Sequence, residues 1–173
     1  MAKKYEFTGE TKVWLGRTLH RIRALISFGE VEVGELGGWI EKEENLSHGG
    51  SAWVGDEATV YGEARVYGSA MVCGEAWVCG EARVWRSTHY LCISPMGSRF
   101  DFTTFFRAKD KKINVKCGCF RGDIDAFSAQ VQATHGDNQH AKAYMAAIEL
   151  ARVQIDLSGE DPEVPESEAN HET

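Results

Sequence analysis

The sequence predicts a mainly β protein, in which a coil of short repeated strands is followed by a small α/β module. Residues 52–87 form six successive hexapeptides, AWVGDE, ATVYGE, ARVYGS, AMVCGE, AWVCGE and ARVWRS. A fixed short period of this kind indicates a repeat architecture. The repeat ends at Ser87. The residues that follow contain three strand-like runs and then two segments with helical spacing of apolar residues.

A β-hairpin is expected first, within residues 1–38. The runs KVWL and TLHRIRALI lie on either side of Gly16 and Arg17. Two strand-like runs around a short link that contains glycine are typical of a hairpin. We expect this hairpin to cap the front of the coil.

The coil is expected over residues 39–87 because of the way its hexapeptides are built. Ala is first and Val is third in every hexapeptide, and Gly is fifth in most of them. A short strand with Val facing inward, followed by a corner where only Gly fits, explains these positions. Glu57 and Arg65 return as Glu75 and Arg83, so the pattern also repeats every eighteen residues. Three hexapeptides per turn would stack such residues on one face, with turns about 4.8 Å apart.

This pattern, written V-x-G-x-A-x, resembles that of the hexapeptide-repeat family. The resemblance implies the fold of that family, a short left-handed parallel β-helix, for residues 39–87. Residues 18–87, with their RIRAL, GELGGWIE and ENLS runs, are also similar to uncharacterised phage and prophage proteins, as are the later FFRAKDKKINVKCGCF and THGDNQHAKAYMAAIELA runs. This second similarity implies a phage origin.

A small α/β domain of βββαα order is expected over residues 88–156. HYLCIS, DFTTFFRA and INVKCGCF are the three strand candidates, separated by the turns PMGSR and KDKK. One helix is expected to begin at Asp123, and a second helix follows a cap at Asp137 or Asn138. Residues 157–173, which are rich in acids and contain two prolines, are expected to be disordered.

The formal net charge of -7 comes from the C-terminal end. Seven acids and no Lys or Arg follow Ile155, which leaves nineteen acids and nineteen bases in the rest of the chain. A balanced body has no overall attraction to nucleic acid. The five Cys are an odd number, the start of the sequence is not signal-like, and no apolar run reaches the about 20 residues that span a membrane. These features predict a cytoplasmic protein with reduced thiols.

The coil should display apolar side chains on two of its faces, because residues beside an inward Val point outward. Apolar surfaces of this kind pack on a partner subunit or on another segment of the same chain. We expect a homo-oligomer and favour a trimer, since flat faces can pack around a threefold axis. The residues concerned are Trp53, Met71 and Cys73 on one face and Thr59, Tyr61, Trp77 and Cys79 on the other.

The third face of the coil is the first candidate site for a ligand. It carries Arg65, Arg83, Tyr67 and Trp85. Guanidinium groups beside aromatic rings can hold an anionic or planar ligand by charge and stacking. Alternatively, the two arginines only stack on these rings and pair with neighbouring glutamates of the repeat.

A turn in the second module is the other candidate site. Gly97, Ser98 and Arg99 can present backbone amides, a hydroxyl and a guanidinium to a phosphate or carboxylate, with Arg107 further along. If the helices pack on the strands, the polar junction between them, residues 135–138, would face this turn. An ordinary hairpin turn followed by helix caps explains the same residues.

Acyl transfer and zinc binding are two further functions for which the sequence offers residues. Many hexapeptide-repeat proteins are CoA-dependent acyltransferases in which a His acts as the base, and this resemblance makes His48 and His89 the candidates. No nucleophile and base pair is discernible, so no catalytic residue is assigned. Cys-x-Cys is not the usual Cys-x-x-Cys pair of zinc sites, so neither a metal nor a cofactor is expected. The residues considered for zinc are Cys92, Cys117, Cys119, His89, His135 and His140.

The sequence therefore predicts a non-catalytic binding or scaffold protein. In this hypothesis, a phage-like protein uses a rigid coil to present a surface that captures a host protein or a small anionic ligand, such as a nucleotide signal. The phage resemblance alone suggests that this capture counters a host defence system. The alternatives are a CoA-dependent acyltransferase and a purely structural phage protein.

Overall fold

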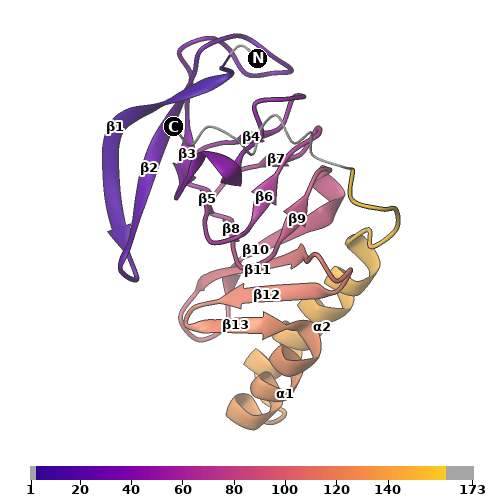
Figure 1. Ribbon diagram of the computed structural model, residues 1–173. Helices are drawn as coiled ribbons and strands as arrows, with labels where there is room; N and C mark the ends of the chain where they lie inside the picture. Colours follow the sequence, from indigo (N-terminus) through magenta and orange to yellow (C-terminus); the bar gives the residue numbers. More distant parts are fainter. Residues whose placement is uncertain (1–2, 163–173) are drawn as a thin grey trace.

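The computed structural model describes residues 3–162 and shows a mainly β protein with two helices at its C-terminal end. A hairpin and a coil of short strands lie on one side of a four-stranded sheet, and the helices lie on the other side (Figure 1). Of the tail that was expected to be disordered, residues 163–173 lie outside the described residues. Residues 157–162 are described and contact the coil and the sheet.

The chain begins with an antiparallel hairpin of β1 (Tyr5–Trp14) and β2 (Arg17–Ala24). Leu15 and Gly16 make the turn, both with positive φ. β2 then pairs antiparallel with β3 (Leu36–Ile40), and β3 pairs parallel with a strand of the coil. The hairpin therefore shares a sheet with the coil.

The hexapeptides form three parallel ladders, and each ladder pairs a valine with the valine eighteen residues later. All six valines are fully buried. The chain thus completes one circuit for every three hexapeptides, with the valines in its interior. The paired strands are β4 (Trp53–Val54) with β7 (Met71–Val72), β5 (Thr59–Val60) with β8 (Trp77–Val78), and β6 (Arg65–Val66) with β9 (Arg83–Val84).

Corners between these strands depend on the fifth residue of each hexapeptide. Gly occupies this place in the middle four hexapeptides, with φ between 65° and 71°. Asp56 adopts the same left-handed conformation in the first hexapeptide, with φ 52°, which Asp tolerates better than most residues. Arg86 holds the fifth place in the last hexapeptide and is extended, with φ -139°. No corner forms there, and the chain leaves the coil through the short helix η2 (Ser87–His89).

The coil has an incomplete turn ahead of its first full one. Ile40 pairs with Val60, and Leu46 pairs with Val66, both in parallel. The helix η1 (Glu43–Asn45) lies between them. The Asn45 side chain is fully buried; its oxygen accepts from two backbone N–H groups, and its amide donates to two backbone carbonyls of the next turn. This side chain therefore fastens the incomplete turn to the coil.

The second module has four antiparallel strands in chain order, so the predicted βββαα order was wrong. The run INVKCGCF is not the single strand that its composition predicts, because Gly118, with φ 52°, allows a tight turn that divides it. Helix caps form at Asp123 and Asn138, whose side chains accept from Ala126 N and Ala141 N. The elements are β10 (Tyr90–Met96), β11 (Asp101–Arg107), β12 (Ile113–Cys117), β13 (Phe120–Asp123), α1 (Ile124–His135) and α2 (Gln139–Gln154).

Strand β11 is a wall shared by two hydrophobic cores. Successive side chains of a strand point to opposite faces, and here Phe106 belongs to the core of the coil while Phe105 belongs to the core under the helices. The end of β11 is attached to the last turn of the coil. Ala108 forms a bridge with Ala82, and Lys109 N donates to the Glu81 carbonyl. This attachment fixes where the neighbouring Arg107 lies.

Segments of the same chain cover much of the apolar surface of the coil. Trp53 is buried against Phe28, with ring centroids 5.5 Å apart. Trp77 packs edge-on against Trp14 of the hairpin, with ring centroids 4.8 Å apart. Arg17 lies over the buried ring of Tyr61. The homotrimer stays a prediction, but the faces that suggested it are partly occupied within one chain.

Candidate functional site

One candidate site combines the third face of the coil with the end of β11. We call it the arginine face and define it as Arg65, Arg83, Arg107, Tyr67 and Trp85. Arg65 and Arg83 are partners in the β6–β9 ladder. The Arg107 guanidinium lies 4.3 Å from the centre of the Trp85 ring, and the Tyr67 and Trp85 ring centroids are 5.6 Å apart. The candidate residues of the coil therefore lie beside Arg107, which the sequence analysis had grouped with the turn at Gly97.

The chain positions this face through its exit from the coil. Because no corner forms at Arg86, η2 brings His89 under the last turn. There the backbone N–H of Trp85 donates to His89 Nδ1 at 3.2 Å, and the two rings meet edge to face, 4.1 Å apart. The Trp85 ring thus contacts both the His89 ring and the Arg107 guanidinium.

Residues 156–161, called the C-terminal segment below, cover the arginine face. Arg107 Nη1 donates to the Ser158 carbonyl and Nη2 donates to the Gly159 carbonyl, both at 3.0 Å. The Asp161 carboxylate lies 3.8 Å from Arg83 Nε and 3.9 Å from Arg107 Nη2. Arg107 is fully buried. The face therefore already holds a carboxylate, which belongs to the chain itself.

The hydrogen bonds of Arg83 bear on the alternative in which the arginines pair with glutamates of the repeat. Its Nη1 donates to the backbone carbonyls of Glu63 and Ala82, at 2.7 and 2.9 Å. The Glu63 carboxylate instead accepts from Lys42. Within residues 3–162, Arg83 forms an ion pair with Asp161 and with no glutamate of the repeat. The arginine is thus positioned by backbone groups, and its Nε faces the acid of the C-terminal segment.

Burial and charge also affect the phenol on this face. Burial, with a further contribution from the Asp161 carboxylate, raises the pKa of Tyr67 well above its usual value, although three neighbouring arginines act in the opposite direction. Tyr67 is therefore a neutral hydroxyl at physiological pH. It can serve as a hydrogen-bonding and stacking group but not as a base.

The turn candidate does not include Arg107, because that residue lies at the opposite end of β11. Grouping it with Gly97, Ser98 and Arg99 was wrong. Gly97 packs against the ring of Tyr144 from α2, while Ser98 and Arg99 are exposed. Tyr144 stacks on His135 at the helix junction, with ring centroids 5.8 Å apart. The turn and the junction are therefore linked through one buried ring.

Neither candidate histidine is placed like a catalytic base. His89 is 0% exposed, and burial lowers its pKa to about 4. His48 stacks on Tyr5, with ring centroids 4.2 Å apart, and its Nδ1 accepts from the Lys4 backbone N–H. A general base must reach the proton that it removes, and the packing of these rings does not offer that access.

The cysteines and histidines named for zinc do not form one cluster: within residues 3–162, no group of three or more His, Cys, Asp or Glu side chains could hold a metal ion. Cys92 accepts a hydrogen bond from Thr104, and Cys117 accepts one from Thr103. His135 and His140 face each other, with ring centroids 5.7 Å apart. Cys119 is exposed.

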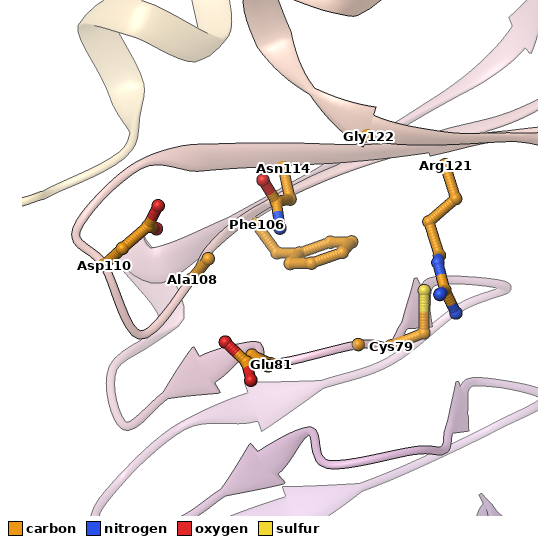
Figure 2. A pocket seen from close by; sticks show the side chains of 9 residues that line it. Cys79, Glu81, Phe106, Ala108, Asp110, Asn114, Arg121 and Gly122 are labelled. Atoms are coloured by element: carbon orange, nitrogen blue, oxygen red, sulfur yellow. The ribbon is translucent and has the colours of Figure 1, made fainter.

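A cleft of about 250 Å³ lies between the last turn of the coil and the four-stranded sheet. Figure 2 shows the Arg121 guanidinium beside Cys79 at one end of it, and the Glu81 and Asp110 carboxylates at the other end, with the Phe106 ring between them. Cys79 is buried, and burial raises the pKa of its thiol. The cleft can admit a small polar group, but its thiol is not a ready nucleophile.

Sequence reasoning missed two parts of the arginine face. It did not join Arg107 to the coil, because the Ala82–Ala108 bridge spans two modules and leaves no local signal. It also treated the acidic tail and the basic face separately. A signal for their contact was present, because the tail contains acids and no bases, while the third face of the coil carries two arginines.

Comparisons with known proteins assign no family to the chain. No protein-family model matches it, and no curated protein matches it significantly. Among residues 3–162, no helix is both long enough and apolar enough to cross a membrane.

Proposed function

We propose that this protein is a non-catalytic binding protein whose arginine face captures an anionic group, carried either by a small ligand or by a host protein. One observation carries the proposal: the Asp161 carboxylate lies within 4 Å of both Arg83 and Arg107. Arginine suits this role, because its guanidinium carries a permanent charge and its planar donors match the geometry of carboxylate and phosphate groups. A surface that holds one carboxylate in this way has the chemistry to hold another anion.

We propose further that the coil is a left-handed parallel β-helix of the hexapeptide-repeat type. Its support is the valine pairing at eighteen-residue intervals and the residue with positive φ, Gly or Asp, at the corners between the hexapeptides. Such a coil is a rigid base for the arginine face. The phage-like resemblance of residues 18–87 is what suggests a host molecule as the source of the anion, and counter-defence as its purpose.

Isothermal titration calorimetry at low ionic strength tests the binding function. The probes are inorganic phosphate, ADP and a hexaglutamate peptide. We expect at least one of them to bind, and Arg83→Gln to weaken its binding about tenfold or more, since a hydrogen bond to a charged group contributes roughly 1.5–3 kcal/mol. Arg23→Gln is the matched control, because Arg23 is an exposed arginine that pairs with Glu6 on the hairpin and lies outside both candidate sites. Equal affinities for wild type and Arg83→Gln would contradict the proposal.

A further inference from the structure

The C-terminal segment makes two kinds of contact with the arginine face. Arg107 binds the backbone of the segment: its two terminal nitrogens donate to the successive carbonyls of Ser158 and Gly159. Arg83 and Arg107 together face a side-chain carboxylate two residues later, that of Asp161. Paired carbonyls followed by a carboxylate are features that any extended acidic peptide can present.

The same segment makes further charged contacts on both sides of this site. Asp156 lies 3.6 Å from Arg86 Nη1, and its backbone N–H donates to the Thr88 carbonyl. Glu160 accepts from Lys111 Nζ at 2.6 Å. A row of four basic side chains therefore faces the three acids of the segment. The basic side chains are Arg83, Arg86, Arg107 and Lys111.

Arg107 depends on this segment for its hydrogen bonds. Its side chain is fully buried while the segment is in place, and both of its terminal nitrogens donate to carbonyls of the segment. A buried charge without partners is strongly unfavourable. A molecule that displaces the segment and buries Arg107 again must therefore supply acceptors for the same two nitrogens.

We propose that the C-terminal segment is an internal pseudo-ligand, and that the partner of the arginine face is an acidic peptide segment of another protein that displaces it. This inference rests on the proposed function and specifies its ligand class. The exposed ion pairs that hold the segment, such as Glu160 with Lys111, are individually weak. The segment competes mainly because it is tethered, which gives it an effective concentration in the millimolar range.

Fluorescence anisotropy with a labelled peptide of sequence DLSGEDPEVPE, residues 156–166 of the chain, tests the inference on the full-length protein. The tail-neutral variant combines Asp156→Asn, Glu160→Gln and Asp161→Asn. We expect it to bind the peptide at least tenfold more tightly than wild type, because its own segment competes less well. Asp161→Asn alone is a milder variant with a smaller effect in the same direction, and circular dichroism checks that each variant is folded.

Two controls are made in the tail-neutral background. Adding Arg83→Gln should reduce peptide binding at least tenfold, whereas adding Arg23→Gln, which changes an exposed hairpin arginine paired with Glu6, should leave it unchanged. Raising the salt concentration should weaken binding, since surface charge pairs are screened. These results together would support displacement of the segment by a peptide at the arginine face.

Other outcomes separate this inference from the proposed function. Equal peptide affinity for wild type and the tail-neutral variant would overturn the pseudo-ligand and leave the binding function intact. If phosphate or ADP binds in a manner that depends on Arg83 while the peptide does not bind, the acidic-peptide partner is wrong and the anion site remains. If no probe binds the tail-neutral variant, the proposed function itself is wrong.

Discussion

At the scale of single residues, the fifth place of the hexapeptide decides where the chain turns. The glycines there have positive φ, which costs other L-residues about 1–2 kcal/mol. Their surroundings differ, however. A side chain at Gly68 would meet the Trp85 carbonyl at 2.8 Å, whereas a side chain at Gly74 would meet nothing within 4 Å.

This difference predicts unequal effects of the same substitution. Gly68→Ala should lower the free energy of unfolding by about 3 kcal/mol, because strain and a backbone clash add together. Gly74→Ala should lower it by only about 1 kcal/mol, from the strain alone. Urea denaturation of both variants measures the two values. Equal losses would show that Trp85 does not pack against Gly68 as described.

His89 predicts a dependence of stability on pH. Its pKa is about 4 in the folded protein and about 6.5 in an unfolded chain, so the unfolded chain takes up the proton first as the pH falls. The contribution of neutral His89 to the free energy of unfolding is therefore fully present above pH 6.5. It is lost as the pH falls towards 4, and the loss is up to about 3 kcal/mol. Urea denaturation at several pH values should show a shallower dependence for His89→Gln, which keeps an acceptor for Trp85 N–H. An unchanged dependence would contradict a buried neutral His89.

At the scale of elements, the sequence was most informative where a pattern is periodic. The inward valines and the two helices with their caps were readable because each depends on nearby residues. The fourth strand of the sheet was missed because β12 and β13 are only separated by Gly118 and Cys119, and a strand-like run does not show where it folds back. The incomplete turn before the repeat was also hard to define, since Asn45 replaces a regular corner.

Asn45 gives a prediction at this scale. Asn45→Ala removes four hydrogen bonds from a fully buried side chain and should cost about 3 kcal/mol, because buried backbone groups lose their partners. Asn138→Ala removes only the cap of α2 and should cost about 1 kcal/mol. Thermal or urea denaturation compares the two. A smaller effect at Asn45 would show that the incomplete turn is held in another way.

At the scale of the whole molecule, the shared strand β11 predicts that the two cores unfold together. All five Trp residues, at positions 14, 39, 53, 77 and 85, lie in the hairpin and the coil, so fluorescence reports that side. Circular dichroism at helical wavelengths reports the other side. The two signals should follow one transition in urea.

Phe106→Ala should move both signals to lower urea concentration together, because it removes a buried ring from β11, the strand that both cores share. The substitution should lower the free energy of unfolding by about 3–5 kcal/mol. Phe127→Ala, on α1, is the control for the helical side and should also move both. Separate transitions for the two signals would mean that coil and helical module fold independently.

The candidate site shows why contacts between distant parts of the chain could not be predicted from the sequence. The sequence predicted one shared face for four residues because the repeat places them at equivalent positions. These residues are Arg65, Arg83, Tyr67 and Trp85. Arg107 was assigned to the wrong group, since its position depends on a contact between two modules. The role of residues 156–161 depends on where α2 ends in space, which no local pattern encodes.

The eighteen-residue circuit restricts how proteins built on this plan can vary in length. Adding or deleting one whole circuit would move the two ends of the molecule apart or together by a single inter-strand spacing, about 4.8 Å, and keep every face aligned. Adding one hexapeptide between β6 and β9 would rotate everything beyond it by a third of a circle and carry Arg83 and Trp85 away from the face that holds Arg65 and Tyr67. Length changes that retain the arginine face should therefore occur in multiples of eighteen.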